Sequence, residues 1–421
     1  MNILMVTNTF TPHVGGVARS VASFSEEYRK LGHRVLTIAP EFDEPVPDEP
    51  DVIRVPAISH FNGSDFSFPL VLPGLLGSAL EEFKPDIVHS HHPFLLGSTA
   101  LRVGAMFAVP VVFTHHTRYE TYTHYVTSSN STFLKRFVVD LATGYCNLCD
   151  AVIAPSQSIA DMLKQHGVET PVEVIPTGVD LDQFERGDGA AFRKASGIDE
   201  KAFVVGHVGR LAPEKNLGFL AQAVAAFLEQ CPTACFLVVG RGPSEDEIRT
   251  VFQERGLTDR LFMPGTLEGQ RLADAYSAMD VFAFSSKSET QGMVLVEAMA
   301  AGVPVVALDA SGVRDVVVDG RNGRLLARES VDDFCAALRW IAGLSPGSRQ
   351  QLEENVERTA ERLSMPHCAE RALNLYLRLV EQKHTPRELD DSPWSATLRW
   401  LEEEWKIVSN VAGAISHALT E

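Results

Sequence analysis

Two glutamates flank a predicted helix start in the segment SSKSETQGMVLVEAMAAGVPVVA, residues 285–307. Seven residues separate Glu289 from Glu297, and Gly292 lies where a strand should turn into the following helix. If that helix begins near Gln291, Glu297 lies about 9 Å farther along its axis, because each residue adds about 1.5 Å. A carboxylate accepts two hydroxyl hydrogen bonds at once, so the pair suits a ligand with hydroxyls at both ends.

The start of the same helix offers a place for an anion between the two carboxylates. N–H groups in a first helical turn lack partners within the helix and attract negative charge. These groups belong to Gly292, Met293 and Val294. A diphosphate here, with hexose hydroxyls at Glu289 and ribose hydroxyls at Glu297, would match this spacing. The segment therefore predicts a nucleotide-sugar site.

A pair of cations lies in the segment GRLAPEKN. Arg210 ends a predicted strand, and Lys215 opens the next helix. Arginine holds a phosphate through its planar fork and lysine holds it as a point charge. We predict that both cations bind the diphosphate. The alternative is an ion pair with Glu214 at the surface.

The turn after the first strand, in NTFTPHVGGVARS, contains a glycine pair. Gly15 and Gly16 directly precede an amphipathic helix, where residues without Cβ let a phosphate or sugar approach the backbone. The segment is not GxGxxG, which disfavours a nicotinamide cofactor. An ordinary turn is the alternative.

Histidines and cysteines raise the question of a metal site, since imidazoles after strands are good ligands. The histidines are His89, His91, His92, His115 and His116. Cys146 and Cys149 form a CxxC motif without a second such pair, and cysteine is a common core residue. We therefore expect no bound metal. We expect His116 to donate a hydrogen bond to sugar or phosphate, with His115 as its structural neighbour.

Short β-branched runs alternate with amphipathic stretches in both halves of the chain, which is typical of buried parallel strands in βαβ units. We predict an α/β fold with two doubly wound sheets. Ligands bind beyond the carboxyl ends of such strands, where the residues above lie. The predicted domains are residues 1–180 and 181–383. Their linker is placed at 177–199, where Gly and Asp are frequent and no apolar period holds.

Residues 384–421 are predicted to form a final amphipathic segment after the break HTPRELDDSP. Its apolar positions recur about every 3.5 residues and form one stripe. They are Trp394, Leu398, Leu401, Trp405, Val408, Ala412, Ile415 and Leu419. We expect this stripe to pack on the N-terminal domain. A membrane surface and a dimer contact are the alternatives.

Charge and hydropathy exclude several classes of protein. The 421 residues carry a formal net charge of −18, whereas nucleic-acid binding requires clustered Lys and Arg. The apolar run at residues 69–80 is interrupted by Pro73 and is shorter than the roughly 18 residues of a membrane span. The initial MNILMVT lacks the basic start of a signal peptide. We therefore expect a cytoplasmic protein.

Taken together, Glu289 and Glu297, GRLAPEKN, the glycine pair and GVPVVA resemble the retaining glycosyltransferases of family 4, which have the GT-B fold. The resemblance covers nearly the whole chain. It implies two Rossmann-like domains facing across a cleft, with the C-terminal helix crossing back, and it implies no metal or other cofactor. By this resemblance Arg210 and Lys215 bind the donor diphosphate, Glu289 the donor sugar and Glu297 the ribose, while His116 lies near the reacting sugar. Catalytic roles are thus expected for His116, Glu289, Arg210 and Lys215.

Within that family, FTPHVGGV and FTHHTRYETYTHYV, residues 113–126, resemble the bacterial diacylglycerol glucosyltransferases. This likeness implies glucose from UDP-glucose as the donor, a lipid hydroxyl as the acceptor and a peripheral contact with the inner face of the cytoplasmic membrane. Tyr119, Tyr122 and Tyr125, together with residues 66–80, would form an apolar mouth, with ordinary packing of the tyrosines as the alternative.

Other functions stay open at this point. A soluble sugar acceptor, a nucleotide-sugar epimerase and a non-catalytic binding module each fit part of the pattern. A pair of glycosidase carboxylates fits less well, because Glu297 on the second helical turn would lie far from the anomeric carbon of the sugar.

Overall fold

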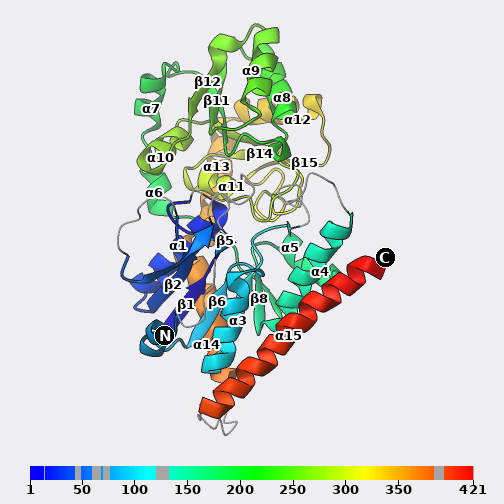
Figure 1. The fold of residues 1–421 in the computed structure, drawn as a ribbon. Coiled ribbons are helices and arrows are strands. Elements are labelled where there is room, and N and C mark those ends of the chain that lie inside the picture. Colours follow the sequence, from blue (N-terminus) through cyan, green and yellow to red (C-terminus); the bar gives the residue numbers. More distant parts are fainter. Residues whose placement is uncertain are drawn as a thin grey trace. The chain divides into compact units, whose positions relative to one another are not determined.

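The computed structural model describes residues 1–13, 15–42, 49–58, 68–69, 76–119, 132–383 and 393–420. They belong to two compact units (Figure 1). Unit 1 comprises Met1–Pro176 and Cys368–Glu421, and unit 2 comprises Thr177–His367. Unit 2 is therefore a continuous insertion within unit 1.

Unit 1 contains a seven-stranded parallel sheet with the order β3-β2-β1-β6-β7-β8-β9. Its strands are β1 (Asn2–Val6), β2 (Arg34–Pro40), β3 (Val52–Val55), β6 (Ile87–Ser90), β7 (Val111–Thr114), β8 (Ala151–Ala154) and β9 (Val172–Val174). The central strands are buried along their whole length, as the β-branched runs predict. A separate antiparallel pair joins β4 (Ala57–Ile58) to β5 (Phe68–Pro69).

Seven helices are described in unit 1: α1 (Gly16–Lys30), α2 (Gly77–Phe83), α3 (Leu96–Phe107), α4 (Thr132–Leu148), α5 (Gln157–Gln165), α14 (Met365–Lys383) and α15 (Pro393–Thr420). Helix α14 begins in unit 2 and belongs mainly to unit 1. Its Tyr376 hydroxyl lies 3.1 Å from the Tyr28 hydroxyl on α1 and 2.5 Å from His89 Nδ1 on β6. This buried chain explains why unit 2 ends at His367, where the sequence had suggested residue 383.

Unit 2 contains a six-stranded parallel sheet with the order β12-β11-β10-β13-β14-β15. Its strands are β10 (Phe203–Val208), β11 (Ala234–Val239), β12 (Leu261–Gly265), β13 (Val281–Phe284), β14 (Val305–Leu308) and β15 (Gly323–Leu326). Its helices are α6 (Leu181–Glu185), α7 (Gly189–Ser196), α8 (Leu217–Gln230), α9 (Glu245–Glu254), α10 (Gly269–Ser277), α11 (Met293–Ala300), α12 (Val331–Ala342) and α13 (Pro346–Arg362), with short 3₁₀ turns η4 (Pro213–Lys215) and η5 (Thr258–Arg260). Apolar clusters cover both faces of the sheet, as in a doubly wound fold.

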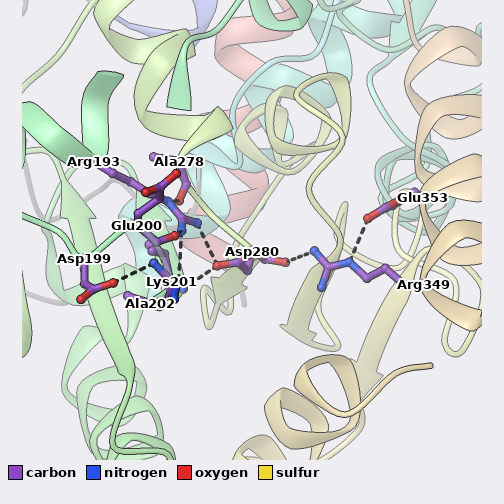
Figure 2. Close-up of polar contacts among 10 residues, drawn as sticks. Arg193, Asp199, Glu200, Lys201, Ala202, Ala278, Asp280, Arg349 and Glu353 are labelled. Carbon is purple, nitrogen blue, oxygen red and sulfur yellow. Dashed lines mark hydrogen bonds and ion pairs between the residues drawn. The ribbon is translucent and has the colours of Figure 1, made fainter. Parts of the chain in front are cut away.

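The predicted linker at residues 177–199 is instead an ordered part of unit 2. Asp180 and Asp188 cap α6 and α7, and the side chains of Phe184 and Phe192 are buried in the core. Figure 2 shows Arg193 of α7 donating hydrogen bonds to the main-chain oxygen of Ala278 at 2.9 Å and to Asp280 at 2.9 Å. The segment lacked a recognisable apolar period because each of its helices is too short to repeat one.

The main chain of unit 2 is cross-linked through Asp280. Its carboxylate accepts the Val204 N–H at 2.7 Å. Its main-chain oxygen accepts a hydrogen bond from Arg349 on α13 (Figure 2). The same arginine donates to Glu353 at 2.8 Å. These bonds join the start of β10 to α7 and α13.

Helix α15 packs on α3 and α4 of unit 1, but through a different face from the predicted one. The packed side chains include Glu403, Ile407, Ala414 and Ala418. The predicted apolar stripe is largely exposed where side chains are described, at Leu401, Trp405, Val408, Ala412 and Ile415. Although α15 is 28 residues long, the described residues include no helix with the length and apolar character needed to cross a bilayer.

Candidate functional site

In unit 2 the structure brings Lys215 and Glu289 together. Lys215 ends η4 just after β10, and Glu289 lies in the loop after β13. The Lys215 Nζ lies 2.5 Å from the Glu289 Oε1, and the two side chains are 21% and 14% exposed. Adjacent strands β10 and β13 explain the meeting, because parallel strands end at one edge of the sheet.

Ser285 fixes the turn that carries Lys215. Its hydroxyl donates to the main-chain oxygens of Lys215 at 2.8 Å and Asn216 at 3.0 Å. Asn216 adopts a left-handed backbone with φ 55°. The lysine is thus positioned by its backbone as well as by its partner carboxylate.

Arg210 lies nearer the solvent than Lys215. Its side chain is 53% exposed, and its guanidinium pairs with Glu214 at 2.5 Å. The ion pair considered as the alternative for these cations is therefore formed by Arg210, whereas Lys215 pairs with Glu289. An exposed pair of this kind contributes little to stability, so Arg210 can exchange its partner at low cost.

Close backbone packing shapes the loop that holds Arg210. Gly240 has φ 135°, and a Cβ there would lie 1.9 Å from the Gly209 main-chain oxygen. Gly242 has φ 153°, and its Cβ would lie 2.4 Å from the Leu211 oxygen. The loops after β10 and β11 therefore pack backbone against backbone.

Helix α11 starts two residues later than Gln291, with Met293 as its first residue and Gly292 as its N-cap. Gly292 has φ 75°, a left-handed conformation that favours glycine. Met293 and Val294 lie in the first turn, where N–H groups attract an anion. The Leu295 N–H already donates to the Gly292 oxygen at 2.9 Å.

Glu297 is the fifth residue of α11 and is buried. The Tyr276 hydroxyl on α10 donates to its Oε2 at 2.8 Å. Tyr276 is itself fully buried and packs edge-on against Phe184. This contact fixes the direction of the carboxylate, and no periodic pattern in the sequence marks Tyr276 for that role.

Gln291 holds the Glu289 loop to the first residue of unit 2. Its side-chain nitrogen donates to the Thr177 main-chain oxygen at 2.6 Å, and its Oε1 accepts the Thr177 N–H at 2.7 Å. Gly312, with φ 75°, passes so close that a Cβ would lie 2.8 Å from the Gln291 nitrogen. Both contacts are remote in sequence, so no local signal predicts them.

His207 on β10 is a further buried group that the sequence did not single out. Its Nδ1 lies 3.1 Å from the Ala283 main-chain oxygen, and its ring stacks against both Phe282 and Phe284. Burial, and to a smaller extent the positive charge of Lys215, lowers the pKa of His207 to about 4. The ring is therefore neutral near pH 7.

In unit 1, His116 follows β7 and contacts His91, which follows β6. His91 Nδ1 and His116 Nε2 lie 2.9 Å apart, so one ring donates a hydrogen bond to the other. Burial, reinforced by neighbouring histidines, holds the pKa of each ring well below its usual value. Burial lowers the pKa of His115 to about 3. In a neutral imidazole one nitrogen donates and the other accepts, so the tautomers of the two rings decide which ring donates to the other.

The glycine pair of unit 1 lies at the start of α1. Gly15 is the extended N-cap of this helix, and a Cβ there would lie 3.0 Å from His13 Nε2. A Cβ on Gly16 would meet no atom of the structure within 4 Å. Space beside Gly16 is compatible with a ligand approaching the helix start.

Several expected features lie outside the described residues or serve packing. Tyr122 and Tyr125, and residues 66–67 and 70–75, are outside the described part of the chain. The ring of Tyr119 packs against Phe94 and His115. Cys146 and Cys149 are free and buried, and burial raises the pKa of both thiols. Among the described residues, no three histidine, cysteine or acidic side chains are grouped as metal ligands.

Comparison with known proteins agrees with this arrangement. The model of Glycosyltransferase Family 4 matches residues 14–183, and that of Glycosyl transferases group 1 matches residues 188–359. The chain is 30% identical over 332 residues to alpha-monoglucosyldiacylglycerol synthase of Streptococcus pneumoniae, covering 77% of this chain and 75% of the relative. It is 33% identical over 348 residues to GDP-mannose-dependent alpha-mannosyltransferase of Mycolicibacterium smegmatis, covering 80% and 87%.

A solved structure shares the fold. HepE of Anabaena, in complex with UDP, matches with a TM-score of 0.69 at 22% identity over 90% of this chain and 100% of its own. Both units of the present chain have the parallel, doubly wound sheets expected of such a protein. From the family matches and the relatives at 30% and 33% identity, we conclude that the chain is a glycosyltransferase of family 4, built from the two Rossmann-like units of the GT-B fold.

Proposed function

We propose that the protein is a retaining glucosyltransferase that moves glucose from UDP-glucose to a lipid hydroxyl such as that of diacylglycerol. The observation that carries the donor half is the Lys215–Glu289 pair at the end of β10 and β13. The pneumococcal relative, a glucosyldiacylglycerol synthase by name, supports the sugar and the acceptor. The UDP in the HepE complex supports uridine as the base. A lipid acceptor implies peripheral contact with the inner face of the cytoplasmic membrane.

In this proposal the donor lies along α11. Lys215 and Arg210 neutralise the diphosphate together with the N–H groups at Gly292, Met293 and Val294. Glu289 accepts hydrogen bonds from the sugar hydroxyls, and Glu297 accepts those of the ribose. A lysine ammonium has three N–H donors, so Lys215 can hold Glu289 and a phosphate oxygen at the same time.

The transfer breaks the bond between the anomeric carbon and the phosphate oxygen and forms a bond to the acceptor oxygen on the same face. The acceptor proton passes to the departing phosphate. His116 donates a hydrogen bond to the sugar, and Gly15 and Gly16 leave space for the reactants near the backbone. The cations and the helix dipole neutralise the leaving group, so we propose that the reaction needs no metal or other cofactor.

A second candidate is transfer of another hexose or to a soluble acceptor. The 33% identity to a GDP-mannose-dependent mannosyltransferase favours it, since that relative covers as much of the chain as the glucosyltransferase does. A nucleotide-sugar epimerase lacks comparable support.

The test is a transfer assay with labelled UDP-glucose or GDP-mannose, using diacylglycerol in detergent micelles or a panel of soluble sugars. We expect label from UDP-glucose to enter the organic extract, and the α-configured product to establish retention. Label that enters only the aqueous oligosaccharide fraction would favour the second candidate. Conversion of the nucleotide sugar into its epimer in the absence of an acceptor would indicate an epimerase.

A further inference from the structure

Helix α15 turns an apolar face to solvent. Among its described side chains, the large exposed apolar ones are Trp400, Leu401, Trp405, Val408, Val411 and Ile415. Trp405 is 74% exposed and Val408 is 57% exposed. A surface helix of a globular protein usually buries its apolar face, so α15 has the reverse arrangement.

The attachment of α15 to unit 1 does not use this face. Polar side chains form its contacts with α3 and α4: Arg399 with the Ala105 oxygen, Glu404 with Arg102, Asn410 with the Leu141 oxygen and His417 with Asp140. Ile407, Ala414 and Ala418 make up the rest of the buried face. The helix can therefore stay in place on unit 1 while its apolar face remains available.

The composition of α15 suits the surface of a bilayer. Residues 407–420 contain no Asp, Glu, Lys or Arg, and both exposed tryptophans lie in the preceding turns. Helices that lie in a membrane interface insert their apolar face to a depth of about 5–10 Å, and tryptophan is enriched at the level of the headgroups. At about 1.5 Å per residue, the exposed apolar side chains from Trp400 to Ile415 extend over roughly 22 Å of the helix.

A second copy of the chain is a poorer match to this surface. A stable interface between proteins usually involves about 20–30 residues and roughly 800 Å² on each partner. Among the α15 side chains that the structure describes, six large apolar ones are exposed, and they lie on one convex helix. A fluid bilayer needs no complementary shape, so the same face suffices there.

We propose that the exposed apolar face of α15 docks the protein on a lipid bilayer. This inference rests on the proposed function in one respect, because docking on a bilayer would bring the enzyme to its lipid acceptor. With a net charge of −18 and Glu402 exposed on α15, apolar insertion drives the binding and attraction to anionic headgroups does not. Binding should therefore include neutral membranes.

The experiment is co-sedimentation of the full chain with phosphatidylcholine vesicles that contain no diacylglycerol and no sugar donor. The test variant is Leu401→Gln/Val408→Gln. Its matched control is Leu31→Gln/Val318→Gln, because Leu31 is 50% exposed against 51% for Leu401, and Val318 is also exposed. We expect the test variant to lower the partition constant about tenfold or more, since each buried side chain of this size contributes strongly to insertion. The control should bind like the wild type.

The salt dependence of vesicle binding distinguishes apolar insertion from electrostatic attraction, and sedimentation velocity tests for a dimer. Binding should persist from about 0.1 M to about 1 M salt, over which the Debye length falls from roughly 10 Å to 3 Å. Vesicle binding that the test variant retains would overturn the proposal. So would a wild-type chain that dimerises in sedimentation velocity through these residues and ignores vesicles. Transfer to diacylglycerol in detergent micelles is measured separately, so loss of that activity would contradict the proposed function while leaving the docking face intact.

Discussion

The Lys215 ammonium and the Glu289 carboxylate neutralise each other in a largely buried place. Removing one partner leaves the other charge uncompensated, which is costly in such surroundings. The proposed function therefore gives the lysine two roles that an experiment must separate. The lysine can stabilise the leaving diphosphate, and it can also hold the glutamate in place.

Lys215→Ala is expected to lower kcat by about a hundredfold or more, because a charge aimed at a departing phosphate acts mainly in the transition state. Steady-state transfer kinetics provide the measurement, with circular dichroism as the check on folding. Lys194→Ala, at an exposed lysine of α7, is the matched control and should leave kcat unchanged. Recovery of activity in Lys215→Ala/Glu289→Gln would mean that the lysine serves only its partner carboxylate.

Glu297→Gln should raise the KM for the donor roughly tenfold with little change in kcat, because a neutral amide binds ribose hydroxyls more weakly in ground and transition states alike. The glutamine oxygen can still accept the Tyr276 hydroxyl, so the fold should tolerate the change. Tyr276→Phe should shift KM in the same direction by a smaller factor. A large loss of kcat at constant KM would instead place Glu297 at the reacting carbon.

At the scale of elements, the Glu289 loop depends on tight backbone contacts around α11. Gly312 and Gly302 have nearly the same left-handed backbone, with φ 75° and 76°. Their surroundings differ, because a Cβ on Gly312 would collide with the backbone of Thr290 and Gln291, whereas one on Gly302 would meet no atom of the structure within 4 Å. The two positions therefore form a matched pair.

Gly302→Ala should lower the free energy of unfolding by about 1 kcal/mol, the cost of a left-handed alanine, without affecting donor binding. Gly312→Ala should cost more and should also raise the KM for the donor, because relieving the collision displaces the Glu289 loop. Urea unfolding and donor titration measure the two effects. Equal KM values in both variants would show that the loop tolerates displacement.

The sequence predicted the strands and the strand-end residues because both follow local patterns. Buried parallel strands are continuous β-branched runs, and Lys215 and Glu289 lie just beyond two of them. Gln291 and Tyr276 were missed, since each acts through a contact with a residue distant in sequence. The start of α11 was misplaced by two residues because the left-handed Gly292 ends the turn before the helix.

The C-terminal helix shows another limit of sequence patterns. An apolar stripe predicts that a helix has an apolar face, but the stripe does not reveal what that face contacts. In α15, hydrogen bonds, two alanines and Ile407 make up the packed face, which carries a weaker hydropathy signal than the exposed stripe. Its length and its place on unit 1 were predictable, whereas its orientation was not.

For the whole molecule, buried histidines should make the stability of unit 1 depend on pH more strongly than that of unit 2. Burial lowers the pKa of His89, His92 and His115 in unit 1 to about 3. In the unfolded chain these rings titrate near 6.5, so their stabilising effect is complete above that pH. It falls progressively as the pH drops from 6.5 towards 3, by up to about 1.4 kcal/mol per pH unit for each ring.

Unit 1 should therefore lose stability on acidification faster than unit 2, to which His207 contributes one such ring with a pKa of about 4. Hydrogen exchange, corrected for intrinsic rates, can compare the protection of β6 and β7 with that of β10 and β11 at about pH 7.5 and 5.5. Between about pH 7.5 and 5.5, we expect protection to fall more in β6 and β7 than in β10 and β11. Equal drops in the two sheets would contradict the prediction.

The insertion of unit 2 has a consequence for how such genes can recombine. The segments that enter and leave it run side by side, joined by the Val179 N–H to the Leu363 oxygen at 2.9 Å and by the Met365 N–H to the Val179 oxygen at 2.8 Å. Residues 177–367 can thus be exchanged between related genes as one cassette with two neighbouring junctions. The second junction falls inside α14, so a working chimera must preserve the helical phase across His367 and Cys368. Chimeras that add or delete one residue there would rotate Tyr376 away from His89 and should fail to fold, even though every catalytic residue is present.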